Sequence, residues 1–275
     1  MVAPKMRRVA AALALALTSL AALQARAGEA PCWVDNGAVL VSASIGDIAG
    51  DFILDLSAPQ SQLHDTIAQS DGLGEATAMD GALSFAGERI PAHLAVANLD
   101  PRTLGFPTTI DGLIGADVLA GYVVDLRLSP CWITLRRQAG RLAGERLPMV
   151  EIAGVPTIAA SVSDGRTARE GRFAIDTGAA GVRLSDAEAH LSRTPKGVDP
   201  ASRAHPPARL AALGFGGAVV LNPAAGLQTG APPQLLGGIG TDVWSRYEVR
   251  LDFKRKELIL SPPQKGQGRT ELRQR

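Results

Sequence analysis

Two stretches of the sequence place an aspartate directly after three apolar residues, and these aspartates are the side chains that could do chemistry. Residues 173–178 are Phe-Ala-Ile-Asp-Thr-Gly, and residues 52–57 are Phe-Ile-Leu-Asp-Leu-Ser. A carboxylate at the end of a buried strand costs free energy unless it is hydrogen-bonded or functional. After Asp176, glycine permits a sharp turn, and the Thr177 hydroxyl offers a hydrogen bond to hold it. On its own, Asp-Thr-Gly is also consistent with an ordinary turn after a strand.

The two aspartate stretches belong to a longer internal repeat. Residues 50–58 align without a gap on residues 171–179, an offset of 121. Two further echoes follow in the same order: residues 112–119 match 237–244, and residues 122–126 and 133–135 match 247–253 and 258–260. Because the three echoes share nearly one offset, we infer a duplication into two lobes, whereas solenoid repeats have shorter periods.

The first 27 residues have the pattern of a targeting signal. Three basic residues precede an almost unbroken apolar run from Val9 to Leu23, and residues 25–27 (Ala-Arg-Ala) form a small-x-small cleavage site. The run is shorter than the roughly 20 apolar residues that a membrane span needs. We therefore expect cleavage after Ala27, export to the periplasm or the cell exterior, and no membrane association beyond export. A retained N-terminal anchor is the alternative.

The repeat also sets the expected domain organisation. After the signal peptide (1–27), we expect an N-terminal lobe at 28–145, a C-terminal lobe at 146–263 and a polar, disordered tail at 264–275. The polar segment 136–148 is interpreted as the connection between the lobes. Residues 192–207, with four prolines, are interpreted as a long surface loop.

The pattern of secondary structure is mostly β. Apolar or alternating runs bounded by turn residues predict strands at 38–45, 82–85, 90–96, 123–128, 157–162, 218–221 and 247–253. Long helical periodicity is missing, and the best helix start is the capping box at residues 185–188 (Ser-Asp-Ala-Glu). The sequence therefore predicts an all-β fold.

Charge excludes some classes of partner. Removing residues 1–27 takes away four basic residues and no acidic ones, which leaves 24 Lys plus Arg against 27 Asp plus Glu, a net charge of −3. The basic residues are scattered along the chain, so no electrostatic footprint for nucleic acid is present. The four histidines, His64, His93, His190 and His205, form no cluster with the spacing of metal ligands. We therefore expect no metal and no cofactor.

Both cysteines, Cys32 and Cys131, lie in the first half of the chain, and each is followed by tryptophan. In an exported protein an even pair favours a disulfide. The bridge would join the first strand of the N-terminal lobe to its last, and the chain-entropy account gives it about 4.7 kcal/mol at most. Two buried free thiols are the alternative.

At these motifs the chain resembles the pepsin-like and retroviral-type aspartic proteases. The resemblance covers essentially the whole mature chain: a strand ending in Asp-Thr-Gly, a later strand ending in two apolar residues and glycine, and a duplication of that unit. It implies a two-lobed, all-β fold with Asp55 and Asp176 as the paired catalytic aspartates. Residues 113–115 and 238–240 would pass beneath the active-site loops. Leu56, Ser57, Thr177 and Gly178 would support those loops.

The chemistry of such a pair follows from electrostatics. Two carboxylates about 3 Å apart cannot both ionise, so they share a proton and titrate as a unit. The ionised partner takes a proton from a bound water while the protonated one donates to the scissile carbonyl oxygen. The result is hydrolysis of a peptide bond without a covalent intermediate.

Several residues depart from the family's pattern. Leu56 supplies no hydroxyl to reach the partner loop, and Ser57 stands where the family has glycine, although its amide and hydroxyl are placed to bond Asp55. Gly238 replaces an apolar residue in the second support strand. Pepsins close a tyrosine-bearing flap over the cleft, yet both tyrosines of this chain follow the apolar-glycine elements. Residues 77–82 are the best candidate for a short flap tip.

These observations leave two functions open, beside the alternative that the chain is an unrelated β protein. The first is an exported aspartic endopeptidase that activates water between Asp55 and Asp176; the second is an inactive relative that binds a peptide or protein in the same cleft. The partner is therefore a peptide or protein, as substrate or as ligand. Asp117 and Asp242 could form a second carboxylate pair, but we expect each to cap the short helix that follows its support strand.

Overall fold

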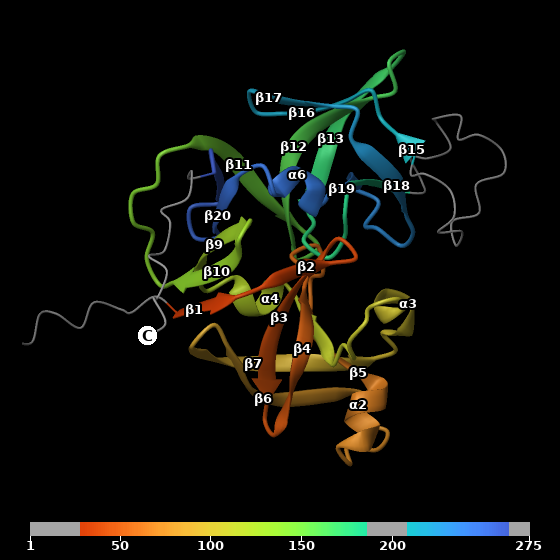
Figure 1. The fold of residues 1–275 in the computed structure, drawn as a ribbon, viewed down its shortest axis with the longest axis vertical. Helices are drawn as coiled ribbons and strands as arrows, with labels where there is room; N and C mark the ends of the chain where they lie inside the picture. Colours follow the sequence, from red (N-terminus) through yellow and green to blue (C-terminus); the bar gives the residue numbers. More distant parts are fainter. Residues whose placement is uncertain (1–27, 186–207, 264–275) are drawn as a thin grey trace, which may run out of the picture.

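The computed structural model describes residues 28–185 and 208–263 (Figure 1). The chain forms two β-rich lobes, one built from most of the first half of the sequence and the other from most of the second half, as the warm and cool colours show. The predicted signal peptide, the loop at 192–207 and the tail at 264–275 lie outside the described residues. So does all of the predicted helix start except Ser185. None of the helices in the described ranges is long and apolar enough to cross a membrane.

The first lobe is a closed barrel of short strands. Its strands are β2 (Trp33–Asp35), β3 (Ala38–Ile45), β4 (Ile48–Leu54), β5 (Gln62–His64), β6 (Ala78–Phe85), β7 (Glu88–Ala97) and β8 (Gly112–Ile114). They hydrogen-bond in the order β2-β3-β4-β8-β5-β7-β6, and β6 pairs back with β3 to close the ring. The β4–β8 and β5–β7 pairs are parallel.

The second lobe repeats this plan as an open sheet. Its strands are β12 (Val155–Ser163), β13 (Ala168–Ile175), β14 (Val182–Ser185), β15 (Ala208–Arg209), β16 (Ala212–Phe215), β17 (Ala218–Leu221), β18 (Ala224–Gln228) and β19 (Leu235–Ile239). The order is β12-β13-β19-β14-β18-β15, with the β16–β17 hairpin attached to β12. Here the parallel pairs are β13–β19 and β14–β18.

The register of the parallel pairs repeats between the lobes, as the predicted duplication requires. Leu54 pairs with Ile114 at the end of β4, and Ile175 pairs with Ile239 at the end of β13. The offsets are those of the sequence echoes. Both aspartate strands therefore end beside a support strand, at equivalent points of the two lobes.

A third group of strands joins the lobes. It consists of β1 (Gly28–Pro31), β10 (Cys131–Arg136), β9 (Val123–Leu128), β20 (Glu248–Asp252), β21 (Glu257–Ser261) and β11 (Glu145–Ile152), in this spatial order. The antiparallel β9–β20 pair crosses from one half of the sequence to the other and places Asp125 opposite Arg250. Because β11 continues from β21 to β12, this sheet is continuous with that of the second lobe. Of the segment predicted as the connection, Arg136 belongs to β10 and residues 145–148 belong to β11.

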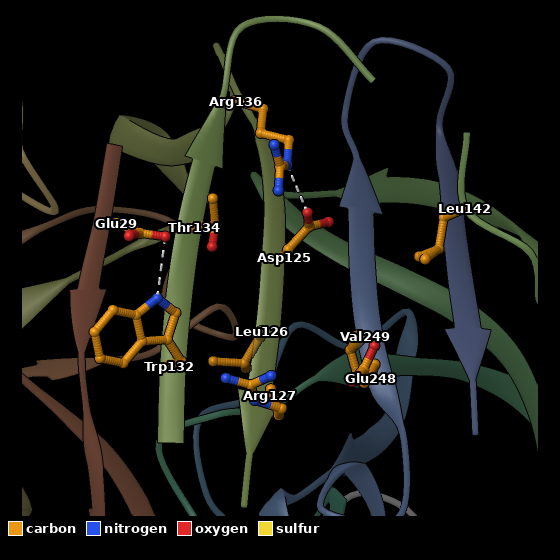
Figure 2. Close-up of a pocket in the computed structure, with 10 residues that line it drawn as sticks. All are labelled: Glu29, Asp125, Leu126, Arg127, Trp132, Thr134, Arg136, Leu142, Glu248 and Val249. Atoms are coloured by element: carbon orange, nitrogen blue, oxygen red, sulfur yellow. Dashed lines mark hydrogen bonds and ion pairs between the residues drawn. The ribbon is translucent and has the colours of Figure 1, made fainter. Parts of the chain in front are cut away.

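Charged side chains cover part of this joining sheet. Figure 2 shows a pocket of about 270 Å³ there, lined by Glu29, Asp125, Leu126, Arg127, Trp132, Thr134, Arg136, Leu142, Glu248 and Val249. Asp125 accepts hydrogen bonds from Arg136 Nε at 2.8 Å and from Arg250 Nη2 at 2.8 Å, and its other oxygen bonds Arg250 Nε. The central ion-pair cluster of the joining sheet is therefore formed by residues from both halves of the sequence.

The disulfide predicted between Cys32 and Cys131 is confirmed, with Cα atoms 4.9 Å apart. It ties the segment between β1 and β2 to the start of β10. The N-terminal segment of the described chain is thereby fixed to the joining sheet, where β1 also pairs with β10.

The helices are short and follow strands or loops: α2 (Asp65–Ser70), α3 (Asp100–Thr103), α4 (Ala116–Leu119) and α6 (Thr241–Trp244). The expectation that Asp117 and Asp242 cap helices is wrong, because Gly115 and Gly240 occupy the N-cap positions and neither helix has a side-chain cap. Asp117 instead accepts hydrogen bonds from the amide and hydroxyl of Ser61. It therefore fastens the loop that follows Asp55.

The predicted flap tip is also wrong. Residues 78–82 lie inside β6, and the turn of the β6–β7 hairpin falls at Ala86 and Gly87. The carbonyl of Ala86 packs directly against Gly28 of β1, so this hairpin ends at the joining sheet. Between β5 and β6 the first lobe carries helix α2, not a hairpin. The turn of the β6–β7 hairpin is therefore held at the joining sheet; the other hairpins of this lobe are β2–β3 and β3–β4.

Candidate active site

The two predicted catalytic aspartates occupy equivalent loops. The Asp55 amide donates to the carbonyl of Ile114 at 2.9 Å, and the Asp176 amide donates to that of Ile239 at 2.9 Å. Three positions after each aspartate, a backbone carbonyl accepts a further hydrogen bond. The Ala58 carbonyl accepts from the Ala116 amide and the Ala179 carbonyl from the Thr241 amide, each at 2.9 Å. Both carboxylates are fully buried. The predicted support strands thus hold the loops as the resemblance implies.

Each carboxylate is oriented by its own loop. Oδ1 of Asp55 accepts from the amide of Ser57 at 2.8 Å and from its hydroxyl at 2.6 Å. Oδ1 of Asp176 accepts from the amide of Gly178 at 2.9 Å. Serine in place of glycine therefore preserves the amide bond and adds a hydroxyl bond, as the sequence indicated.

Thr177 joins the two loops across the lobes. Its hydroxyl donates to the carbonyl of Leu54 at 2.7 Å and accepts from the amide of Leu56 at 3.0 Å, while its own carbonyl accepts from Val39 at 2.8 Å. Leu56, at the equivalent position of the other loop, has no hydroxyl and cannot make the corresponding bonds to the loop of Asp176. Its side chain is buried in the hydrophobic core instead. The cross-lobe connection is therefore made from one side, as the missing hydroxyl predicted.

A pair of arginines lies against the aspartates. Arg102 of α3 donates from Nη2 to Oδ2 of Asp55. Arg183 of β14 donates to Oδ2 of Asp176 from Nε at 2.9 Å and also from Nη2. Each aspartate thus forms an ion pair with an arginine of its own half of the sequence. Sequence reasoning did not identify either arginine.

Close packing brings the two loops together at this point. A Cβ atom on Gly178 would lie 2.5 Å from Asp55 Oδ2 and 2.8 Å from Arg102 Nη2. Gly178 is therefore needed because the loop of one lobe passes directly over the ion pair of the other. Gly238 has a related role, since a Cβ atom there would lie 3.2 Å from Asp176 Oδ2. The apolar residue expected at this support position would crowd the carboxylate.

The two carboxyl groups differ in pKa. Burial and the neighbouring charge of Asp55 raise the pKa of Asp176 to about 6, although Arg183 opposes the shift. Burial would also raise the pKa of Asp55, but Arg102, with the Ser57 hydroxyl, holds it below its usual value. The carboxylate of Asp55 in turn raises the pKa of Arg102 against the effect of burial. Asp55 therefore stays ionised, whereas Asp176 takes up a proton in mildly acidic solution.

Elsewhere the described residues offer no metal site. Within residues 28–185 and 208–263, no group of three or more His, Cys, Asp or Glu side chains is arranged to hold a metal ion. Both ring nitrogens of His64 lie near carboxylates, those of Asp65 at 2.8 Å and Asp100 at 3.3 Å. The candidate site therefore consists of the two aspartates, their loops and the two arginines.

The fold is similar to that of the aspartic proteinase from Irpex lacteus. The likeness covers 87% of this chain and 98% of the proteinase, with a TM-score of 0.55 and a sequence identity of 12%. At this identity the likeness establishes a pepsin-like fold and not an activity. No protein-family model matches the sequence, and no curated protein matches it either.

Proposed function

We propose that this chain is an exported pepsin-like protein that binds an extended peptide segment beside Asp55 and Asp176 without hydrolysing it. The observation that carries the proposal is the pairing of each buried aspartate with an arginine. A fold of this kind supports a peptide-binding role, because the family it resembles receives peptides between its lobes. The N-terminal targeting pattern supports export.

The ion pairs oppose the hydrolytic mechanism for a chemical reason. Hydrolysis requires one protonated and one ionised carboxyl group that share a proton and hold a water between them. Here Oδ2 of each aspartate accepts from a guanidinium, so an arginine occupies an oxygen that a shared proton or a bound water would need. Arg102 also lies where the two loops meet, against Gly178.

Endopeptidase activity in acid is the second candidate, and one observation favours it. The pKa of Asp176 is raised to about 6, so this carboxyl group is neutral in mildly acidic solution while Asp55 remains ionised. That is the protonation state the hydrolytic mechanism uses. Arg183 would then have to leave Asp176 and admit a water.

A peptide library distinguishes the two functions. The mature protein is incubated with random-sequence peptides across acid and neutral pH, new termini are sought by mass spectrometry, and bound peptides are recovered by affinity selection. We expect recovery of bound peptides without new termini. Cleavage in acid that disappears in both Asp55→Asn and Asp176→Asn would establish the endopeptidase and refute the binding function. N-terminal sequencing of the exported protein tests cleavage after Ala27, with Gly28 expected as the first residue.

A further inference from the structure

The charged groups that a ligand would meet at this site are guanidinium groups. The carboxylates of Asp55 and Asp176 are 0% exposed, whereas the side chains of Arg102 and Arg183 are 37% and 24% exposed. The buried aspartates therefore hold the arginines in place, and the arginines form the solvent-accessible part of this cluster of four charged side chains. The site therefore presents cationic groups to a ligand, while its carboxylates are buried.

The arginines also retain hydrogen-bond donors. A guanidinium carries five N–H donors in a planar fork. Asp55 engages only Nη2 of Arg102, and Asp176 engages Nε and Nη2 of Arg183. Within the described ranges, Nε and Nη1 of Arg102 and Nη1 of Arg183 donate to no protein acceptor. Both arginines are thus fixed by one carboxylate while unused donors remain for a second acceptor.

We propose that Arg102, with Arg183 beside it, binds a carboxylate of the peptide ligand, supplied by an acidic side chain or by the peptide's C-terminus. This inference rests on the proposed binding function and names its ligand class. Arginine is suited to the role because its planar fork matches a carboxylate, and charge-assisted hydrogen bonds are about twice as strong as neutral ones. An uncharged peptide in the same position would leave those donors without a charged partner.

Protonation of the site strengthens this preference. The charged groups that face Asp176 are Asp55, Arg102 and Arg183. On α3, Asp100 lies near His64 Nε2 and is not among the charges that act on Arg102. With both aspartates ionised the cluster has no net charge; with Asp176 neutral it carries one positive charge. A ligand carboxylate with a pKa of about 4.3 is still ionised near pH 5, so it gains attraction there.

The test compares matched peptides. Hexapeptide pools labelled with an uncharged, pH-insensitive dye carry a fixed Glu or Gln at position 3, no Asp or Glu at the randomised positions, and a free or amidated C-terminus; binding is measured by anisotropy at about pH 5 and about pH 7.5. We expect the wild-type protein to bind at least one carboxylate-bearing pool about tenfold or more tighter than the Gln, amidated pool. The margin should be larger at the lower pH. The Glu and C-terminal arms identify the source of the carboxylate.

Variants separate the inference from the function on which it rests. Arg102→Gln with Asp55→Asn removes the ion pair without leaving either charge buried alone, and the affinity ratio between the carboxylate-bearing pools and the Gln, amidated pool should fall from about tenfold to about one. The control Arg89→Gln changes an exposed arginine on the β6–β7 hairpin and should behave as wild type. Equal binding of all pools by the wild type would overturn the carboxylate preference and leave the peptide-binding function standing. Absence of binding to every pool would overturn both.

Discussion

Replacing Gly178 by alanine tests the contact between the two active-site loops. The new Cβ atom would lie 2.5 Å from Asp55 Oδ2, 2.6 Å from its Cγ and 2.8 Å from Arg102 Nη2. Atoms this close must move apart, and both neighbours are held by the ion pair. Asp55 is fully buried.

The expected loss of folding stability combines two destabilising terms and one stabilising term. Overpacking costs about 1–3 kcal/mol, and the cost rises to about 3–5 kcal/mol if Asp55 loses its buried partner. The smaller freedom of alanine in the unfolded chain returns only about 0.4–1 kcal/mol. We therefore expect Gly178→Ala to lower the free energy of unfolding by about 3 kcal/mol.

Urea unfolding with the disulfide intact measures this loss. For an m-value of about 3 kcal/mol per molar, the midpoint should fall by about 1 M. Gly121→Ala is the matched control, because a Cβ atom at Gly121 would have nothing within 4 Å. It should leave the midpoint unchanged or raise it slightly. Equal midpoints for the two variants would refute the close approach of Gly178 to the Asp55–Arg102 pair.

Three further predictions concern the site and its support. The pKa of Asp176 is higher in the folded than in the unfolded state, so its contribution to stability is full below about pH 4 and is lost as pH rises through about 6. Asp176→Asn should therefore flatten the pH dependence of the urea midpoint in that window. An unchanged pH profile would contradict the raised pKa. Thiol titration of the unreduced protein should detect no free thiol, and Cys32→Ser with Cys131→Ser should cost up to about 4.7 kcal/mol in thermal or urea unfolding. Thr177→Val leaves the carbonyl of Leu54 and the amide of Leu56 without these partners, so it should lower the free energy of unfolding by about 1–3 kcal/mol in urea. A loss near zero would show that this connection between the loops is dispensable.

The repeated elements of the fold could be predicted because they are local. The apolar strands that end at Asp55 and Asp176, and the support strands that end at Ile114 and Ile239, are contiguous in sequence and occur twice. Their pairing follows once the duplication is recognised. The serine bond to Asp55 could be anticipated for the same reason, since donor and acceptor lie two residues apart.

The arginines were missed for different reasons. Arg102 lies 47 residues from Asp55 in a connecting segment, and no periodicity relates them. Arg183 offered a signal: it follows Asp176 by seven residues on a strand between apolar neighbours, and its counterpart in the first repeat is Gln62. A cation at only one of two equivalent positions indicated that the lobes differ at the site. Asp117 was misjudged because helix proximity suggested a cap, whereas its partner, Ser61, is 56 residues away.

The ion pair between Asp125 and Arg250 has a consequence for the ancestry of the fold. These residues are equivalent in the duplication, and they face each other in the β9–β20 pair, so the pseudo-twofold axis passes between them. In a dimer of identical halves, this position would oppose its own copy, and like charges would repel across the axis. Once the two halves differ in sequence, the two copies of this position can take opposite charges. The Asp125–Arg250 bond therefore favours unlike halves, and two copies of either half would not reproduce it.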